Sequence, residues 1–148
     1  DGAQVLLIPF RMAPGAGKQL AAQHSHSLEG WYAHIPGLKV VAPYTAADFK
    51  GLLKSAIRDD NPVIFFQNEN LYGQSFDVPD DKDWTVPIGK ARIARPGKDV
   101  TITAFSIMVG KALEAAGLGL DEVEVVETDL RSGLVGRHGN VTETRIMF

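Results

Sequence analysis

The first half of the chain contains short, largely apolar stretches separated by polar and glycine-rich segments. These stretches are VLLIPF, KVVAP and VIFFQ, at residues 5–10, 39–43 and 63–67. An apolar run of this length without polar alternation predicts a strand that is buried on both faces. Such strands are typical of parallel sheets, and the glycine- and proline-rich segment at residues 11–19 is expected to be a loop.

Apolar residues recur at helical spacing between these predicted strands. A helix over about residues 27–34 would align on one face Leu28, Trp31, Tyr32 and Ile35. A second helix begins after Thr45, with Asp48 three residues later in an aspartate variant of the capping box. It ends at DDNP, because the residue before a proline is pushed out of the α region. The apolar stripe of this second helix comprises Ala46, Phe49, Leu52, Leu53, Ala56 and Ile57.

The strand, capped helix and strand from residue 39 to residue 67 predict a βαβ unit and therefore a parallel sheet. Prolines and aspartates break this rhythm at residues 73–98, which we expect to be a linker with a short extended piece and a domain boundary. A second βαβ unit then begins with a strand at 99–106, a helix at 108–117 and a strand at 122–128. The expected fold class is α/β.

Composition restricts the classes of function. The 148 residues carry a formal net charge of -3, with 45% hydrophobic and 22% charged residues, so a globular chain is expected, with no electrostatic reason to bind nucleic acid or an anionic membrane. No apolar run approaches the ~20 residues that span a bilayer. There is no cysteine, which excludes disulfides and thiolate ligands. A strand-like run near residue 1 and an apolar last stretch lead us to expect an excerpt of a longer protein.

Two segments suggest ligand chemistry but fit it incompletely. PGAGKQ follows a predicted strand as a phosphate-binding loop would, yet Met12 stands where that motif requires glycine and Gln19 where it requires Ser or Thr. His24 and His26 are two residues apart, as two metal ligands on a strand would be. They are equally compatible with one working histidine on a loop, or with two partly exposed loop residues.

The end of the second helix suggests a cation site. The last turn of a helix leaves carbonyl groups unpaired and carries the negative end of the macrodipole. Asp59, Asp60 and Asn61 follow directly and add oxygen atoms of the kind that hard cations prefer. The alternative is an ordinary helix end with solvated aspartates.

The longest family likeness lies in AAQHSHSLEGWYAHIPGLKVVAPYTAADFKGLLKSAIRDDNPVIFF, at residues 21–66. This stretch resembles the beta subunits of the thiamine-diphosphate-dependent component of pyruvate dehydrogenase. The likeness continues through NLYGQSF, VPIGKARI and GKDVTITAFSIMVGKALEAA, and it covers residues 5–117. The resemblance implies the C-terminal part of a transketolase-type pyrimidine-binding domain at 1–78 and a linker at 79–98. Residues 99–148 would start a transketolase C-terminal-type α/β domain, atypical after residue 131.

The resemblance also implies an activity and its requirements. Members of this family take part in the oxidative decarboxylation of pyruvate with acetyl transfer to lipoyl groups, in the bacterial cytoplasm or the mitochondrial matrix. The implied cofactors are thiamine diphosphate shared with an alpha subunit, magnesium held by that subunit, and structural potassium. The implied partners are the alpha subunit, a second beta subunit in a heterotetramer, and a lipoyl-bearing acyltransferase. We expect neither a nucleic acid nor a membrane partner, and we expect the chain alone to be inactive.

The resemblance assigns roles to individual residues. His24 lies in a Gln-His-Ser motif and corresponds to a histidine near the reactive end of the cofactor, with a role in substrate binding or acyl transfer. The potassium ligands, mostly backbone carbonyls with one carboxylate, would be Ile8, Ala56, Ile57, Asp59 and Asn61. The residues that contact the cofactor's aminopyrimidine ring belong to a portion N-terminal to this sequence. No cofactor-binding residue is therefore expected within the chain.

Some positions depart from the family pattern and keep alternatives open. His26 stands where glutamine is usual, and Gln67 where glutamate is common. Of the usual Arg-Gly-Pro-Asn-Gly loop only Arg11 and Gly15 are kept. The alternatives are a non-catalytic chain that keeps only the fold or a subunit interface, a beta subunit of a branched-chain or acetoin dehydrogenase, and another thiamine enzyme of the transketolase group.

Overall fold

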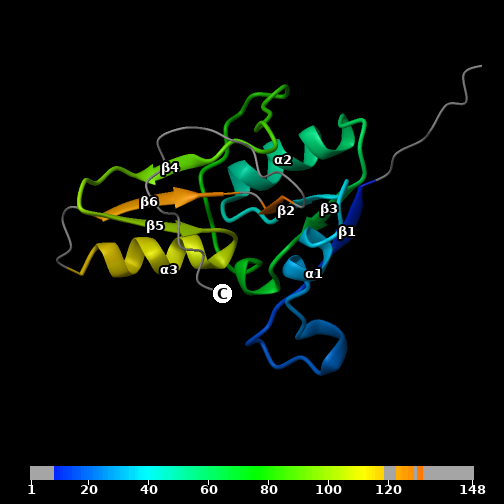
Figure 1. Ribbon diagram of the computed structural model, residues 1–148, viewed down its shortest axis with the longest axis horizontal. Coiled ribbons are helices and arrows are strands. Elements are labelled where there is room, and N and C mark those ends of the chain that lie inside the picture. Colours follow the sequence, from blue (N-terminus) through cyan, green and yellow to red (C-terminus); the bar gives the residue numbers. More distant parts are fainter. Residues whose placement is uncertain (1–8, 119–122, 129, 132–148) are drawn as a thin grey trace, which may run out of the picture.

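The computed structural model describes residues 9–118, 123–128 and 130–131, which form two sheets with helices packed on them (Figure 1). The first sheet has the strand order β1-β3-β2-β7. Its parallel strands are β1 (Phe10–Met12), β3 (Val63–Phe66) and β2 (Lys39–Val41). The fourth strand, β7 (Leu130–Arg131), pairs antiparallel with β2. The predicted α/β class, with a parallel sheet and flanking helices, is confirmed.

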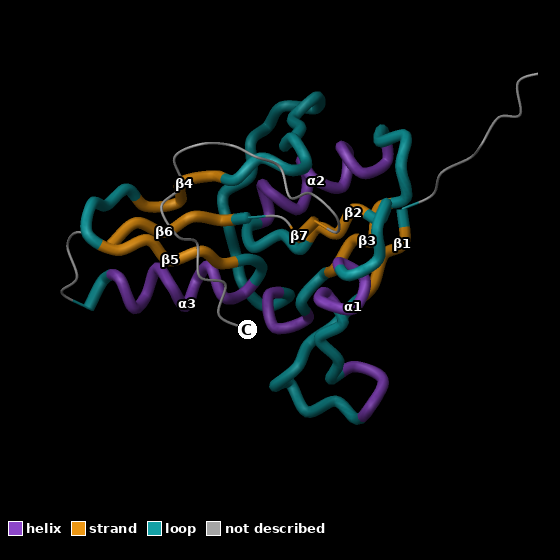
Figure 2. The backbone as a smooth tube through the Cα atoms, viewed as in Figure 1, coloured by secondary structure: helices purple, strands orange, loops and turns teal. Residues whose placement is uncertain are grey.

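Side-chain alternation along the central strands explains why each face of the first sheet is covered by a helix. Val41 and Phe65 point to the face on which α2 (Ala46–Ile57) packs. Val40 and Phe66 point to the opposite face, which α1 (Glu29–Ala33) covers. Figure 2 shows the two helices on opposite sides of the strands. All four residues of β3 are buried, as predicted for a strand that is apolar on both faces.

The predicted capped helix is present with its predicted ends. Thr45 Oγ1 accepts a hydrogen bond from the Asp48 amide at 3.1 Å, and the Asp48 carboxylate accepts one from the Thr45 amide at 3.4 Å. These reciprocal bonds form the capping box and satisfy amide groups that have no partner within the helix. Since β2 and β3 are parallel neighbours, the segment from β2 to β3 is the predicted βαβ unit.

Two details of the predicted elements are wrong. Strand β1 covers residues 10–12, so Arg11 and Met12 belong to a strand and not to a loop, while residues 5–8 lie outside the described residues. Backbone pairing with β3 decides this, because ladder hydrogen bonds do not require apolar side chains. The predicted stripe on α1 is only half buried, since Leu28 and Tyr32 join the core whereas Trp31 is 76% exposed.

The second sheet has the order β4-β6-β5. Its strands are β4 (Arg92–Arg95), β6 (Val123–Glu127) and β5 (Val100–Ala104). Strand β5 runs parallel to β6, and α3 (Ile107–Ala116) connects them and packs on the sheet, which confirms the second βαβ unit. The extended piece within 73–98 is β4, which pairs antiparallel with β6. The domain ranges 1–78, 79–98 and 99–148 stay a prediction.

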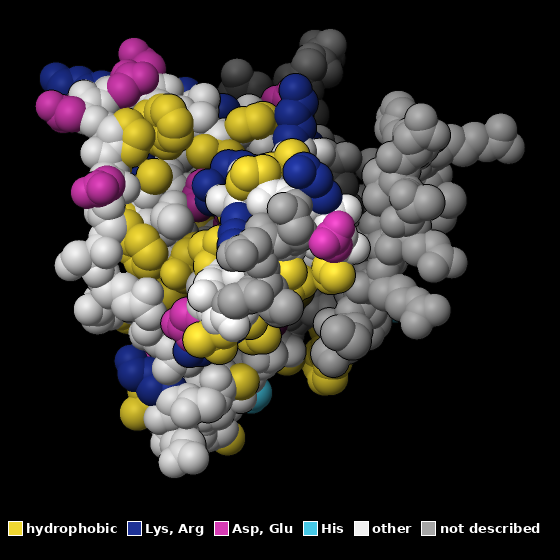
Figure 3. Space-filling view, turned by 90° about the vertical axis from the view of Figure 1, so that its left-hand side faces the viewer, with side chains coloured by type: hydrophobic (Ala, Val, Ile, Leu, Met, Phe, Trp, Pro, Cys, Tyr) yellow, Lys and Arg dark blue, Asp and Glu magenta, His cyan; other side chains and the backbone are white. Residues whose placement is uncertain are grey.

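Contacts between the two sheets join them directly. The Ser106 amide donates to the Ala42 carbonyl at 3.0 Å, and Phe105 packs against the first-sheet core. The second sheet exposes Ile93 on β4 and Val100 at the outer end of β5, and Figure 3 shows hydrophobic side chains among charged ones on the side of the molecule where this sheet lies. Within the described residues, no helix combines the length and apolar character needed to cross a bilayer.

Candidate functional site

The carboxyl ends of β1 and β3 meet at one edge of the first sheet. Because the two strands are parallel neighbours, the loops that follow them lie against each other. The Gln67 amide donates to the Met12 carbonyl at 2.8 Å, and the Glu69 amide donates to the Pro14 carbonyl at 2.9 Å. Two segments more than fifty residues apart in the sequence therefore form one surface.

Glu69 is held at this edge by a short helical turn. It opens the 3-10 helix η2 (Glu69–Leu71), whose start is fixed by the Asn68 side chain accepting a hydrogen bond from the Asn70 amide at 3.0 Å. The Glu69 side chain is only 11% exposed. Lys18 from the opposite loop donates to the Glu69 carbonyl at 3.3 Å. The carboxylate is thus almost buried on a backbone that both loops anchor.

His24 lies opposite this carboxylate. It ends the 3-10 helix η1 (Ala22–His24), and its Nδ1 lies 3.0 Å from Oε1 of Glu69. A carboxylate accepts hydrogen bonds, so this contact fits an imidazole whose Nδ1 atom carries a proton and donates it to Glu69. The His24 side chain remains 56% exposed. Its Nε2 atom is therefore the ring nitrogen available for proton transfer or hydrogen bonding outside the pair.

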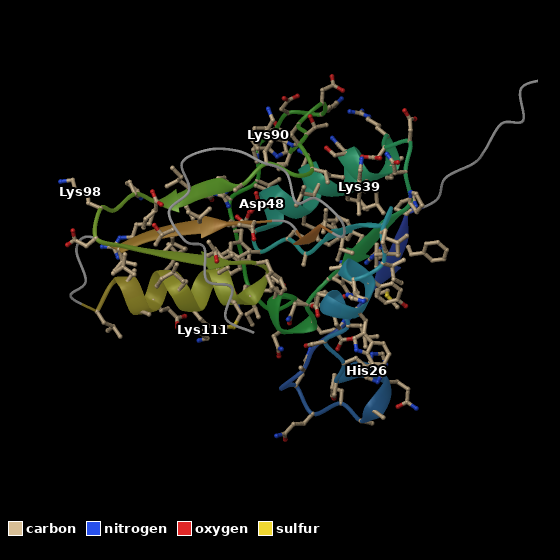
Figure 4. All side chains as sticks on the ribbon, viewed as in Figure 1. His26, Lys39, Asp48, Lys90, Lys98 and Lys111 are labelled. Carbon is tan, nitrogen blue, oxygen red and sulfur yellow. The ribbon has the colours of Figure 1, made fainter. Side chains whose placement is uncertain are left out.

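The structure separates the two histidines of the HSH motif. Figure 4 places His26 on the loop that carries η1, away from Asp48 and Lys39 beside the sheet. His26 is exposed, and His24 sits in a 3-10 turn, so the pair lacks the strand geometry that two neighbouring ligands would need. Among residues 9–118, 123–128 and 130–131, no group of three or more His, Cys, Asp or Glu side chains could hold a metal ion.

An apolar cavity of about 220 Å³ opens at the same sheet edge, beyond β2 and β3. Its lining side chains include Tyr44, Phe49, Gln67, Leu71, Tyr72 and Phe76. Tyr44 and Phe76 pack edge to face, with ring centroids 5.4 Å apart. Arg11 donates to the Gln67 side chain and lies 6.0 Å from the Phe49 ring centroid. A cavity of this size and lining suits a small apolar or aromatic group.

At the end of α2, where the cation site is predicted, the Asp59 carboxylate pairs with a lysine of the chain itself. The Lys39 ammonium lies 2.6 and 2.8 Å from the two Asp59 carboxylate oxygens, and Asn61 donates to Asp59 through its amide and side chain at 2.9 Å. Burial by itself would raise the pKa of Asp59, but these hydrogen bonds and the lysine charge outweigh it and lower the pKa. The Asp59 carboxylate is therefore ionised and already neutralised by Lys39.

The remaining predicted potassium ligands fall in different settings. Ala56 is buried and Ile57 is 60% exposed at the last turn of α2. Asn61 lies on the turn before β3 and is exposed. Ile8 lies outside the described residues. The four described positions lie within residues 56–61, at and just after the last turn of α2, and their role as potassium ligands stays a prediction.

Sequence reasoning missed Glu69 and Lys39. Glu69 sits three residues beyond a buried strand, which is where functional side chains of parallel sheets gather, and this was the available signal. Its pairing with His24 depends on β1 and β3 being neighbours in the sheet. The local sequence around neither residue specifies that strand order. Lys39 opens β2, and its approach to Asp59 depends on the path of α2 across the sheet.

The chain is similar to proteins of known function along most of its length. Residues 1–74 match the family model described as "Transketolase, pyrimidine binding domain". Over 126 residues the chain is 58% identical to "Pyruvate dehydrogenase E1 component subunit beta" of Rhizobium meliloti, covering 84% of this chain and 27% of that relative. It is 54% identical over 127 residues to the mitochondrial E1 beta subunit of Caenorhabditis elegans, covering 80% of this chain and 36% of that relative. The chain thus spans about a third of the length of these relatives.

A solved structure shares the fold. The protein described as "Split gene transketolase, inactive beta4 tetramer" is similar with a TM-score of 0.62 and 26% sequence identity. The match covers 80% of this chain and 38% of that one. The likeness therefore extends over both sheets and not over the first alone.

Proposed function

Since the chain belongs to the family of pyruvate dehydrogenase E1 beta subunits, we propose that it supplies the histidine-bearing part of such a subunit. The proposed reaction is the oxidative decarboxylation of pyruvate with transfer of the acetyl group to a lipoyl group. The observation that carries the proposal is the exposed His24, held by the buried Glu69 at the carboxyl edge of the parallel sheet. In this role His24 is a catalytic residue that binds the substrate or exchanges a proton during acyl transfer.

The proposed cofactor is thiamine diphosphate, shared with an alpha subunit that also holds magnesium. When bound, it supplies the electron sink that decarboxylation requires. The described residues fit a group bound at the carboxyl edge, because His24 and the apolar cavity both lie there. None of the described residues is assigned as a ligand of the cofactor. The contribution of this chain is then an orienting surface and a proton-carrying side chain.

The proposed partners are an alpha subunit, a second beta subunit and a lipoyl-bearing acyltransferase. An exposed apolar side of α1 supports a subunit contact, with Trp31 76% and Ile35 48% exposed. Large exposed apolar side chains in one place mark interaction surfaces. The relatives include bacterial and mitochondrial proteins, so the proposed location is the bacterial cytoplasm or the mitochondrial matrix.

The function is tested by transplanting the chain into a relative. Residues 9–118 replace the matching segment of the Rhizobium meliloti beta subunit, and the chimera is combined with the alpha subunit of the same enzyme. We expect pyruvate-dependent reduction of an artificial electron acceptor, and we expect His24→Ala to lower kcat by about 100-fold or more. A folded chimera that assembles with the alpha subunit yet has no activity would contradict the proposal. Equal activity with other 2-oxo acids would favour a branched-chain or acetoin enzyme.

A second candidate, that the chain by itself is non-catalytic, is favoured by one observation. The similar transketolase assembly is described as an inactive tetramer of beta chains alone. We therefore expect the 148-residue chain to show no pyruvate decarboxylation without an alpha subunit. Decarboxylation by the purified chain alone would refute this expectation.

We further propose a structural potassium ion at the end of α2, bound by carbonyl groups of Ala56 and Ile57 with Asp59, Asn61 and Ile8. Carbonyl groups at a helix end, which lack the hydrogen-bond partners that carbonyl groups inside a helix have, support the site, although the Asp59 amide donates to the Ala56 carbonyl at 3.4 Å. The Lys39 ammonium competes for the Asp59 carboxylate. Potassium would therefore have to share Asp59 with Lys39.

Competition between potassium and the Lys39 ammonium for the Asp59 carboxylate gives a testable prediction. At equal ionic strength we expect the melting temperature of the chain to be higher in potassium chloride than in lithium chloride, because an ion that binds only the folded state stabilises it. Lys39→Met is expected to enlarge this difference by freeing Asp59, and Asp59→Asn to abolish it. Identical melting temperatures in both salts for the unchanged chain and for Lys39→Met would rule the site out.

A further inference from the structure

Glu69 is the buried carboxylate closest to the exposed histidine of the site. A carboxylate with a side chain only 11% exposed requires hydrogen-bond donors, because burying an unsatisfied charge is costly. His24 Nδ1 provides such a donor at 3.0 Å. The two residues come from different loops, 45 positions apart in the sequence.

The backbone of Glu69 is fixed independently of His24. Its amide donates to the Pro14 carbonyl at 2.9 Å, and its carbonyl accepts from the Tyr72 amide at 3.2 Å and from Lys18 Nζ at 3.3 Å. Gly15 packs so closely that a Cβ atom there would lie 3.2 Å from the Glu69 Cβ. The side chain therefore leaves the backbone from a defined position.

His24, in contrast, lies on an exposed turn with few restraints of its own. Its side chain is 56% exposed, and η1 has no side-chain cap. Among the described residues, Glu69 is the hydrogen-bond partner of its imidazole. The fixed carboxylate thus determines where the ring lies, and not the reverse.

The pair contributes orientation more than stability. Ion pairs and hydrogen bonds with one exposed partner contribute little to folding, typically about 0–1 kcal/mol. Their effect on a ring is geometric, because a carboxylate that accepts from Nδ1–H selects one tautomer and one ring direction. A histidine that served only folding would be expected to be buried.

We propose that Glu69 is the positioning residue of His24. It holds the proton on Nδ1, so that Nε2 is the nitrogen presented to the substrate side of the sheet edge. The substrate that Nε2 would face, an acyl group in transfer to a thiol, rests on the proposed function. The placement of the proton stands on the 3.0 Å contact and the burial of Glu69 alone.

The test reads the tautomer of each histidine in the 148-residue chain labelled with 15N. At about pH 9 imidazoles are neutral, and long-range 1H–15N correlations distinguish the Nδ1–H form from the Nε2–H form that free imidazole side chains prefer. We expect His24 in the Nδ1–H form. His26, two residues away and exposed, is the internal control and is expected mainly in the Nε2–H form.

Two substitutions complete the test. Glu69→Ala removes the acceptor, so His24 is expected to return to the tautomer distribution of His26, with His26 unchanged. Glu69→Gln keeps the side-chain volume but offers both a donor and an acceptor, so it is expected to give a mixture of tautomers at His24 and serves if the alanine variant does not fold. An Nε2–H form of His24 in the unchanged chain would overturn the proposal. Persistence of the Nδ1–H form in a folded Glu69→Ala variant, or a His24 tautomer distribution in Glu69→Gln identical to that of the unchanged chain, would also overturn it.

A kinetic measurement connects the tautomer to activity. In the chimera with its alpha subunit, Glu69→Gln is expected to lower kcat for acetyl transfer by about 10-fold to 100-fold with a smaller change in KM for pyruvate. A change of this size in KM for pyruvate, with kcat unchanged, would contradict a positioning role. Because the tautomer is measured without activity, an inactive chimera would count against the proposed function alone.

Discussion

At the scale of single residues, the buried carboxylates of the first sheet differ in what satisfies them. Glu69 has the imidazole of His24, and Asp48 has the amino end of α2 together with Arg92 from β4. Glu29 is 6% exposed in the first turn of α1, and no charged partner is found for it among the described residues. Burial raises the pKa of Glu29, and a backbone hydrogen bond offsets this only in part. Glu29 is thus the carboxylate that weakens the fold when it ionises.

This state of Glu29 gives a pH-dependence of stability with a definite sign. A raised pKa in the folded state means that the folded chain binds the proton more tightly than the unfolded chain. The stability is then fully present below the ordinary pKa of 4.5 and is lost as the pH rises through the raised pKa. We expect Glu29→Gln to unfold at higher urea concentration than the unchanged chain at about pH 8, with the difference shrinking towards about pH 4. A difference that does not vary with pH would contradict this assignment.

The side chains of the site differ in whether the sequence alone could identify them. His24 was identified through its Gln-His-Ser motif, whereas its partner Glu69 has no motif of its own. Asp59 is predicted from the sequence as a cation ligand, and the structure adds that its carboxylate pairs with the ammonium of Lys39. Local sequence gives the chemical type of a side chain, while its partner depends on which loops the strand order brings together.

At the scale of elements, α2 shows how local signals fix a helix. Its amino end carries the capping box of Thr45 and Asp48, and its apolar residues Leu52 and Ala56 are buried against the sheet. Its predicted span agrees with the structure because caps and apolar spacing act within a few residues. Strand β1 continues to Met12, beyond its predicted end at Phe10, because pairing with β3, a contact across more than fifty residues, extends it.

The capping box allows a quantitative prediction. Thr45→Ala removes the oxygen that accepts from the Asp48 amide, and we expect a loss of about 1 kcal/mol in the free energy of unfolding. Thr45→Ser keeps this oxygen and is the matched control, with little change expected. Chemical denaturation followed by circular dichroism measures both. An equal loss in the two variants would show that the methyl group, and not the cap, matters.

At the scale of the whole molecule, the two sheets are joined where α3 approaches the segment after β2. A Cβ atom added at Gly110 of α3 would lie 2.5 Å from Tyr44 Oη and 2.8 Å from Tyr44 Cζ. Tyr44 in turn packs on Phe76 and lines the apolar cavity. Arg92 crosses the same boundary, binding Asp48 at 3.0 Å and Glu127. The absence of a side chain at Gly110 therefore sets how closely the sheets approach.

Gly110→Ala tests this close approach. Overpacking costs about 1–3 kcal/mol, and the better helix propensity of alanine returns roughly 1 kcal/mol, so a net loss of stability is expected. Tyr44→Phe removes the nearest atom and is expected to recover part of the loss in the double variant. Gly30→Ala in α1 is the control, because no atom lies within 4 Å of its added Cβ, and there a gain is expected. Stabilisation by Gly110→Ala would mean that the sheets have room to separate.

The sequence by itself determined the fold class, the two βαβ units and the capped helix, because these follow from apolar spacing and hydrogen bonds between near neighbours. Its motif also singled out His24. Only the tertiary structure decided that Glu69 holds His24, that Lys39 neutralises Asp59, and that β7 joins the first sheet. These contacts join residues 20 or more positions apart. They form because parallel strands bring their following loops to one edge, and no local pattern specifies which strands will be neighbours.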